Sequence, residues 1–254
     1  TNQLYGDDAA KRRARVDARF VNTAMKATLM GAEISDGLDN GQVVSGVGGQ
    51  YNFVAQAFEL VGARSLLTVE ATRQDKADAV SNIRWSYGHT TIPRHLRDII
   101  VTEYGVADLR GKSDADVIAA MLNVADSRFQ QELMRQAQDA GKLPKDHEIP
   151  AAHRDNSPDR IKAALKPARE AGLLPSFPFG SDFTDVEQRL IPALQILQEA
   201  SRSPFALVRR SINGLRAGEA SAQPALARMG LDRPNMFSDR LYRALLNGAL
   251  KRSL

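Results

Sequence analysis

The pattern of apolar and polar positions changes character near residue 127. Before it, short apolar runs of strand length alternate with amphipathic segments, and after it the apolar residues recur at helical spacing. This order predicts an α/β domain with a helical C-terminal appendage. We expect strands at the start of 20–30 and over 43–44, 65–70, 83–87 and 98–104, with a loop over 71–79 and a turn region over 105–112. We expect helices over 7–19, 51–60, 114–123, 128–140, 158–172 and 185–202, and two or three short helices in 205–254.

Two of these helices have a recognisable start. Ser113 and Ser157 each stand immediately before a helical segment, and a serine side chain at that position can accept a backbone N–H of the first turn. Pro158 suits the first position of a helix because its missing N–H has no partner there in any case. The helices are therefore expected to begin at Asp114 and Pro158.

A glycine-rich segment connects the first strands to the first long helix. Val43 and Val44 run into Gly46, Gly48 and Gly49, and helical spacing follows. This predicts a strand, a tight turn and a helix start. Such a turn directs backbone N–H groups toward an anion or a developing oxyanion.

Two other interpretations of the turn remain open. It can be a purely structural turn, or it can begin a dinucleotide-binding fingerprint in which Glu70 contacts the ribose. The fingerprint requires a third glycine, and Tyr51 occupies that position. The mismatch weakens the dinucleotide interpretation, and an anion or oxyanion site is favoured.

Carboxylates and histidines supply the other candidates. Glu103 ends an apolar strand, so it is either a catalytic or orienting acid or a structural carboxylate bonded to the next turn or to Arg110; Glu33 and Glu70 are weaker candidates. The histidines form pairs six residues apart with a proline between the members of each pair, a poor arrangement for a shared metal. We expect no metal site, and the histidines concerned are His89, His95, His147 and His153.

Composition limits the class of protein. With 43% hydrophobic and 25% charged residues in 254, the chain resembles an ordinary globular protein. The absence of cysteine excludes disulfides and a thiol nucleophile and fits a cytoplasmic protein. No apolar run reaches about 18 residues, so neither a membrane span nor export is indicated.

The positive charge is concentrated at the C-terminal end. Ten Arg or Lys residues and three acidic residues lie from Arg202 onward, which gives this tail a charge of +7 in a chain of net charge +4. Solvated helix faces explain such a tail most simply, and phosphate-bearing ligands or an acidic neighbouring subunit are alternatives. Nucleic acid is disfavoured because no stacking aromatic residues alternate with the basic ones.

Two blocks together suggest a family. The blocks are SGVGGQYNF (residues 45–53) and VTEYGVADLRGKS (residues 101–113), with HTTIPR (residues 89–94) between them. They resemble the C-terminal half of the acetyl-CoA hydrolase/transferase family, which includes acetate, succinate and 4-hydroxybutyrate CoA-transferases. The resemblance is dense from about residue 20 to residue 129. It implies an open sheet flanked by helices, in one of two similar halves that meet over the active site.

The resemblance also implies a reaction and a set of roles. Coenzyme A would move between carboxylic acids through an enzyme-bound glutamyl thioester, or be released by hydrolysis. The implied partners are an acyl-CoA and a small carboxylate, the N-terminal half of the same protein and a second copy of the chain, with coenzyme A as substrate and no tightly bound cofactor. The implied roles are oxyanion N–H donors at Gly48 and Gly49, substrate or CoA contacts at Gly46, Gln50 and Asn52, and supporting roles at Glu103 and Arg94.

One departure from the family pattern concerns the nucleophile. In relatives the nucleophilic glutamate lies well upstream of the turn, and Glu33, the single glutamate before Gly46, is too close to it. We therefore expect the nucleophile outside this chain, the chain to be a piece of a longer protein, and the chain alone to be inactive. A non-catalytic module for CoA, acyl-CoA or subunit contact is the alternative. The expected domains are 1–201, CoA-transferase-like, and 202–254, a basic helical tail.

Overall fold

The computed structural model describes residues 9–75, 78–175, 177–201 and 222–251. The chain divides into two compact units, residues 1–173 and 174–254. This division differs from the boundary expected at residue 201, because helix α6 (Asp185–Ser201) packs with helices farther along the chain. Part of the expected basic tail, residues 202–221 and 252–254, lies outside the described residues.

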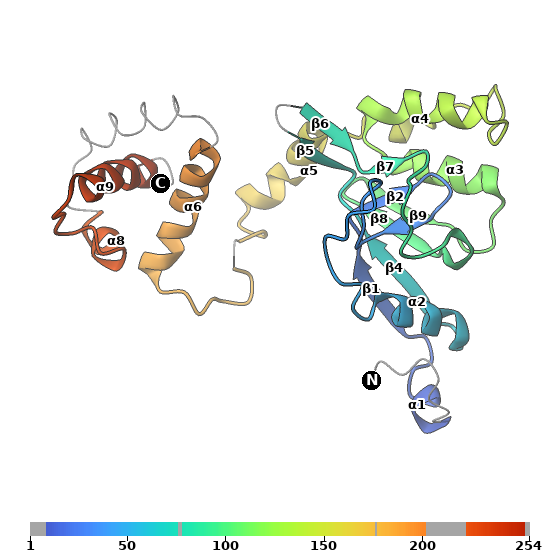
Figure 1. Cartoon of the computed structure of the whole chain (residues 1–254), viewed down its shortest axis with the longest axis horizontal. Helices are drawn as coiled ribbons and strands as arrows, with labels where there is room; N and C mark the ends of the chain where they lie inside the picture. Colours follow the sequence, from blue (N-terminus) through green and yellow to red (C-terminus); the bar gives the residue numbers. More distant parts are fainter. Residues whose placement is uncertain (1–8, 76–77, 176, 202–221, 252–254) are drawn as a thin grey trace. The chain divides into compact units, whose positions relative to one another are not determined.

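The main sheet of the first unit has four strands in the order β1-β4-β8-β9. β1 (Arg19–Thr23), β4 (Arg64–Thr68) and β8 (Ile99–Thr102) are parallel, and β9 (Gly105–Asp108) returns antiparallel to β8 (Figure 1). Leu67 pairs with Ile100, and both side chains are buried. The predicted α/β class with an open sheet is confirmed.

Two smaller sheets complete the strand content of the described residues. β2 (Lys26–Thr28) pairs with β3 (Glu33–Ile34) and β7 (Ile83–Arg84). β5 (Thr72–Asp75) and β6 (Asp78–Ser81) form an antiparallel hairpin. The predicted loop over 71–79 and the predicted turn region over 105–112 are therefore wrong in part: a hairpin of mainly polar residues, half of them exposed, lies in the first, and residues 105–108 form β9. These strands form because their backbones pair with a neighbouring strand, and hydrophobic periodicity does not reveal that pairing.

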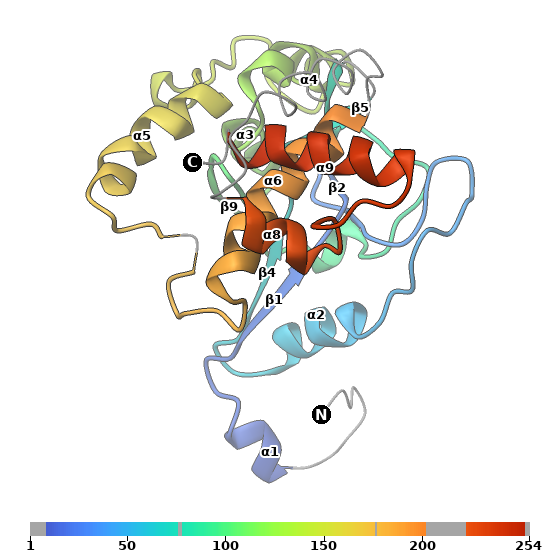
Figure 2. The same ribbon diagram turned by 90° about the vertical axis from the view of Figure 1, so that its left-hand side faces the viewer.

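Helices cover the main sheet. α2 (Gln50–Glu59) packs against β1 and β4 (Figure 2). α3 (Asp114–Asn123) packs against β9 and contacts α4 (Ser127–Asp139). Met121 and Leu122 are fully buried in the core that α3 shares with the sheet. The helix at the N-terminus, α1 (Ala9–Arg13), is shorter than the predicted 7–19.

The predicted helix starts are confirmed. The Ser113 side chain accepts the N–H of Asp116 at the start of α3. The Ser157 side chain accepts the N–H of Arg160 at the start of α5 (Pro158–Glu170). Local capping thus fixes two helix boundaries that the sequence specifies directly.

The second unit is helical in its described part. α6 packs against α8 (Gln223–Arg228) and α9 (Phe237–Leu250), and the three helices lie together in both views (Figure 2). Leu190, Leu226 and Leu246 are buried between them. Arg228 on α8 pairs with Glu187 on α6 at 2.8 Å. No helix in the described part of the chain is both long and apolar enough to cross a membrane.

Candidate functional site

The segment that leads into the glycine turn is held by its backbone. The carbonyl of Asp36 accepts the N–H groups of Val44 and Ser45, and the Ser45 hydroxyl donates to the carbonyl of Ser35 at 3.0 Å. Val43 makes an isolated bridge to Gly37, so the strand predicted at 43–44 is wrong. The two valines are 70% and 43% exposed, because no neighbouring strand or helix covers them in the described structure.

Asp36 is itself fixed by a second loop. Its carboxylate accepts a hydrogen bond from the Thr91 hydroxyl and lies 2.9 Å from His89 Nε2. These hydrogen bonds, from Thr91 and then His89, hold the pKa of Asp36 below its usual range. Gly37 is required here because a Cβ would lie 2.7 Å from the His89 ring. The loop at 88–91 therefore positions the segment before the glycine turn, a role that the sequence did not reveal.

The glycine turn is open and leads directly into α2. Gly48 has a φ of +58°, a left-handed conformation that favours glycine, and Gly49 is the N-cap of α2. A Cβ built at Gly46 or Gly48 meets no atom within 4 Å. Packing within the described chain therefore gives no reason for glycine at 46, and the space above the turn is free for a ligand.

The start of α2 lacks the usual means of satisfying its N–H groups. No side chain caps it, and no acidic residue lies in its first turn. Among the described residues, the N–H groups of Gly48, Gly49, Tyr51 and Asn52 find no acceptor. Unpaired donors at the positive end of a helix dipole form a ready site for an anionic oxygen.

The side chains beside the turn differ in exposure. Gln50 is 7% exposed, and its Nε2 is buried without a hydrogen-bond partner. Asn52 is half-buried, and Tyr51 is 43% exposed. The Phe53 ring stacks on Phe20 of β1 at 5.8 Å, which fixes the first turn of the helix to the sheet. The predicted contact residues thus lie around the turn, with Gln50 facing inward.

The segment after β8 uses its polar groups internally. The Thr102 hydroxyl donates to the carbonyl of Val124 and accepts the N–H of Tyr104. The Tyr104 hydroxyl donates to Asp126, which also binds Arg128 and caps α4. Burial alone would raise the pKa of Asp126, but hydrogen bonds from Arg128 and Tyr104 outweigh it and lower the pKa. This network connects the β8–β9 turn to α4.

Glu103 belongs to the same segment. Its Oε2 accepts the N–H of Ala71 at 2.9 Å, which fastens the end of β8 to the residues after β4. Arg110, the other partner considered for it, instead pairs with the buried Asp98 at 2.5 Å. A structural carboxylate therefore describes Glu103 better than a free catalytic acid.

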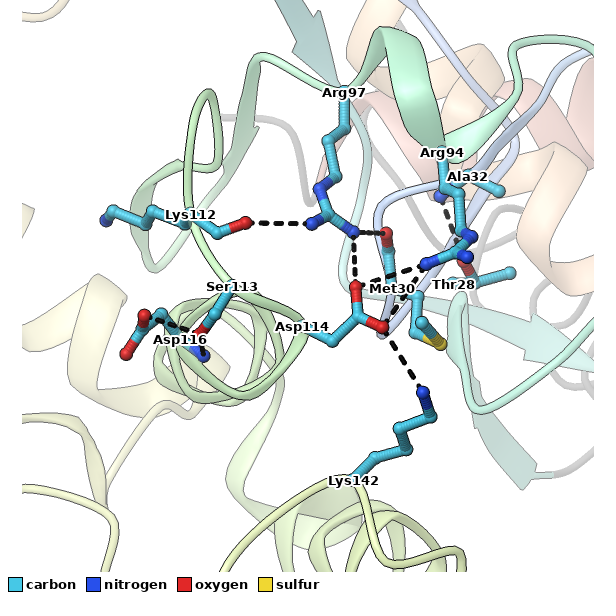
Figure 3. Close-up of polar contacts among 10 residues, drawn as sticks. All are labelled: Thr28, Met30, Ala32, Arg94, Arg97, Lys112, Ser113, Asp114, Asp116 and Lys142. Atoms are coloured by element: carbon cyan, nitrogen blue, oxygen red, sulfur yellow. Dashed lines mark hydrogen bonds and ion pairs between the residues drawn. The ribbon is translucent and has the colours of Figure 1, made fainter.

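Arg94 lies in a cluster around Asp114 at the start of α3. Arg94, Arg97 and Lys142 all reach this carboxylate, at 3.1, 3.2 and 3.4 Å (Figure 3). Burial would raise the pKa of Asp114, but the hydrogen bonds from Arg97 and Lys142 and the charge of Arg94 lower it overall. Arg94 is thus bound to a structural carboxylate and keeps 56% of its side chain exposed.

The remaining candidates are dispersed. Glu33 is 2% exposed, and its burial, then the charge of Asp98, raise its pKa to about 8. Glu70 is exposed, and its carbonyl accepts the Asn82 amide. A dinucleotide fingerprint needs a strand directly before the glycines, and residues 43–44 form none, so that interpretation fails. Within the described ranges no three histidine, aspartate or glutamate side chains form a metal-binding group.

The glycine turn and the residue 101–113 segment both lie within a match to a family model. Residues 1–137 match the model of the acetyl-CoA hydrolase/transferase C-terminal domain, which covers more than half of the chain. The chain belongs to this acetyl-CoA hydrolase/transferase family. The family resemblance of the two sequence blocks is therefore confirmed.

Relatives within the acetyl-CoA hydrolase/transferase family are CoA-transferases. The 4-hydroxybutyrate coenzyme A transferase of Clostridium kluyveri is 31% identical over 117 residues, which are 46% of this chain and 27% of that protein. The butyryl-CoA:acetate CoA-transferase of Anaerostipes caccae is 31% identical over 140 residues, 54% of this chain and 31% of that protein. The matched part of this chain thus spans about a third or less of these relatives.

The match to solved structures likewise covers about half of this chain and less than a third of each matched chain. RipA from Yersinia pestis matches with 29% identity and a TM-score of 0.45, over 50% of this chain and 28% of that one. A 4-hydroxybutyrate CoA-transferase from Porphyromonas gingivalis matches with 24% identity and a TM-score of 0.38, over 48% and 27%. The family match ends at residue 137, before helices α5, α6, α8 and α9.

Proposed function

We propose that this chain supplies the oxyanion-stabilising part of an enzyme that acts on acyl-CoA thioesters. The observation that carries the proposal is the exposed turn at the uncapped start of α2, where the N–H groups of Gly48 and Gly49 find no acceptor among the described residues. The CoA-transferase names of the relatives support an acyl-CoA as one substrate and a small carboxylate as the other.

The proposed chemistry uses these donors at the moment when charge develops. Attack on the thioester carbonyl places negative charge on its oxygen, and backbone N–H groups fixed in advance stabilise that charge by about 3 kcal/mol. The dipole of α2 adds to the effect because no acidic side chain in the first turn offsets it. Gly46 and Gly48 leave room for the thioester to approach.

We place the nucleophilic glutamate outside this chain, in the N-terminal half of the same protein. Glu33, the single glutamate before the turn, is buried in β3 and has no exposed path to a substrate. The external carboxylate would attack the thioester, form an acyl anhydride and release the CoA thiolate. The thiolate would then attack the glutamyl carbonyl, release the product carboxylate and leave a glutamyl-CoA thioester.

The other residues receive narrower roles. Gln50 and Asn52 are proposed to hold the turn and contact the thioester, since the Gln50 amide nitrogen has a hydrogen bond still to give. Glu103 is proposed to act through the scaffold, because it binds another part of the domain. Arg94 is proposed to support the site from its pair with Asp114, and it keeps an exposed side chain. Water in place of the second carboxylate would make the enzyme a hydrolase.

The alternative proposal is a module that binds CoA or a second subunit without performing chemistry. The burial of Glu33 favours this alternative, because the chain then exposes no glutamate nucleophile before the turn. Under this alternative, the glycine turn would bind CoA, and no covalent intermediate would form on any protein containing the chain.

Borohydride trapping tests the proposal. The full protein is incubated with acyl-CoA and borohydride, which reduces an enzyme thioester and inactivates the enzyme. We expect inactivation of the wild type and resistance of the Gly48→Val variant, because a damaged oxyanion site prevents the thioester from forming. Absence of inactivation in the wild type would favour the binding module, and turnover by this chain alone would contradict an external nucleophile.

A further inference from the structure

An open, basic pocket near the C-terminal end of α2 has no role in the proposed function. It encloses about 540 Å³, and Phe58 and Gly111 line it together with five basic residues. Three segments contribute: the last turns of α2, the short 3-10 helix η1 (Arg94–Leu96) with the residue after it, and the turn between β9 and α3. The basic residues are Arg94, His95, Arg97, Arg110 and Lys112.

Two of these basic residues are bound by the fold. Arg110 pairs with the buried Asp98 and donates to the carbonyl of Ala63. Arg97 donates to the carbonyls of Met30 and Lys112 and pairs with Asp114. Their charges are offset by carboxylates, and their many bonds make the pocket wall rigid.

The other three basic residues, Arg94, His95 and Lys112, can still donate hydrogen bonds into the pocket. The Lys112 ammonium and the His95 ring have no partner among the described residues, and the Lys112 side chain extends away from Asp114 (Figure 3). Arg94 shares Asp114 with two other cations and stays 56% exposed. The pocket therefore holds more positive than negative charge, and its free donors suit an anion with several oxygens.

One exposed face of α2 links this pocket to the glycine turn. Tyr51, Ala55 and Phe58 follow each other at i, i+4 and i+7, and the two aromatic rings are 43% and 38% exposed. The face covers about 10 Å along the helix axis. The Phe58 ring is held at the pocket by the Arg110 guanidinium, 4.3 Å from its centroid.

We propose that the basic pocket binds the phosphate groups at the nucleotide end of the acyl-CoA. Arg94, His95 and Lys112 contact the phosphate oxygens, and the Tyr51–Ala55–Phe58 face carries the pantetheine arm toward the turn. The thioester then lies at Gly48 and Gly49 while the highly charged end of the same molecule is held near the other end of the helix. This inference rests on the proposed function, because it assigns a second contact to the same substrate.

Calorimetry on this chain tests the assignment with three probes: CoA, pantetheine and inorganic pyrophosphate. The test variant is the double substitution His95→Gln and Lys112→Gln, and the control is Lys162→Gln on α5, another exposed lysine, with a weak pairing to Asp159. Both test side chains are exposed and have no partner in the part of the chain that the structure describes, so the fold is expected to persist. We expect the test variant to bind CoA and pyrophosphate about tenfold more weakly, with pantetheine unchanged and with wild-type behaviour of the control.

The outcomes separate this inference from the proposed function. Unchanged CoA binding by the double variant would overturn the pocket assignment and leave the glycine turn untouched. Pyrophosphate binding by the wild type without binding of CoA or pantetheine would show an anion pocket unrelated to acyl-CoA, which contradicts both proposals. A Gly48→Val variant that loses pantetheine but keeps pyrophosphate would support two separate contacts.

Discussion

At the glycine turn, the backbone N–H groups of Gly48, Gly49, Tyr51 and Asn52 find no acceptor among the described residues. In residues 102–105, by contrast, most polar groups already have a partner. The N–H groups of Gly48 and Gly49 are free in the described structure, and a Cβ at Gly48 would meet only open space. Thr102 and Tyr104, in contrast, connect β8 to Val124 and Asp126. Both segments carry the family resemblance, yet one leaves backbone donors unpaired and the other uses its polar groups to hold the domain together.

The difference shows how to separate a site from its scaffold. An unsatisfied donor in an exposed turn costs little in water, so a fold can keep it available for binding. A buried donor or acceptor must find its partner within the protein, because leaving it unpaired costs about 1–3 kcal/mol. Substitutions in the turn should therefore change activity, and substitutions in the second segment should change stability.

The largest expected effect comes from Gly48→Val. The side chain would fill the space above the turn and strain the left-handed backbone, so kcat/KM of the full enzyme should fall about 100- to 1,000-fold. Stability should fall by about 1–2 kcal/mol. Gly141→Val is the matched control, since Gly141 has a φ of +65° and open space around it. Equal activity losses in both variants would show that strain alone explains the effect.

Asp126→Ala should mainly destabilise the domain. The carboxylate is fully buried and binds Arg128, the Tyr104 hydroxyl and the start of α4, so its loss should cost about 2–3 kcal/mol of unfolding free energy. Urea denaturation measures this. Asp139→Ala, which removes an exposed pair with Arg135, should cost less than about 1 kcal/mol. A stable Asp126→Ala protein with low activity would assign the second segment to the site.

Glu33→Gln should change how stability depends on pH. The folded-state pKa of Glu33 is raised to about 8 from 4.5, so the folded protein holds a proton that the unfolded chain releases between these values. Stability should therefore fall as pH rises from about 5 to 8, by on the order of 3 kcal/mol. Denaturation at several pH values should show a flatter profile for the glutamine variant, and parallel profiles would contradict the buried, protonated carboxyl.

Tyr104→Phe should have the smallest effect. It removes one hydroxyl that donates to Asp126 and leaves the ring in place, which should cost about 1 kcal/mol of unfolding free energy. Arg128 continues to neutralise Asp126, so the carboxylate stays paired. Activity per folded molecule should equal that of the wild type, and a large loss of kcat with unchanged stability would place Tyr104 in the chemistry instead.

Local signals in the sequence predicted the elements that local interactions determine. The strands at 65–70 and 98–104 and the serine-capped helices at 114 and 158 are confirmed because apolar runs and caps act within a few residues. The β5–β6 hairpin and β9 were missed since polar strands form by pairing with a neighbour. The two valines before the glycine turn resemble a strand, but among the described residues Val43 makes only an isolated bridge to Gly37.

The candidate site shows the same limit. The glycine turn was recognisable because glycine spacing and a helix start are local features. The support of that turn by Asp36, His89 and Thr91 was not, because Asp36 lies more than 50 positions from the other two. The basic pocket was likewise hidden, since it gathers residues from α2, η1 and the β9–α3 turn.

The most direct test is an NMR titration of this chain, labelled with ¹⁵N-glycine, with acetyl-CoA. If the turn receives the thioester, the amide signals of Gly48 and Gly49 should shift, while Gly105 in the β8–β9 turn should stay in place as an internal reference. Gly111 should shift as well if phosphate occupies the basic pocket. Saturable binding that leaves Gly46, Gly48 and Gly49 unshifted would contradict the assignment of the turn as the oxyanion site.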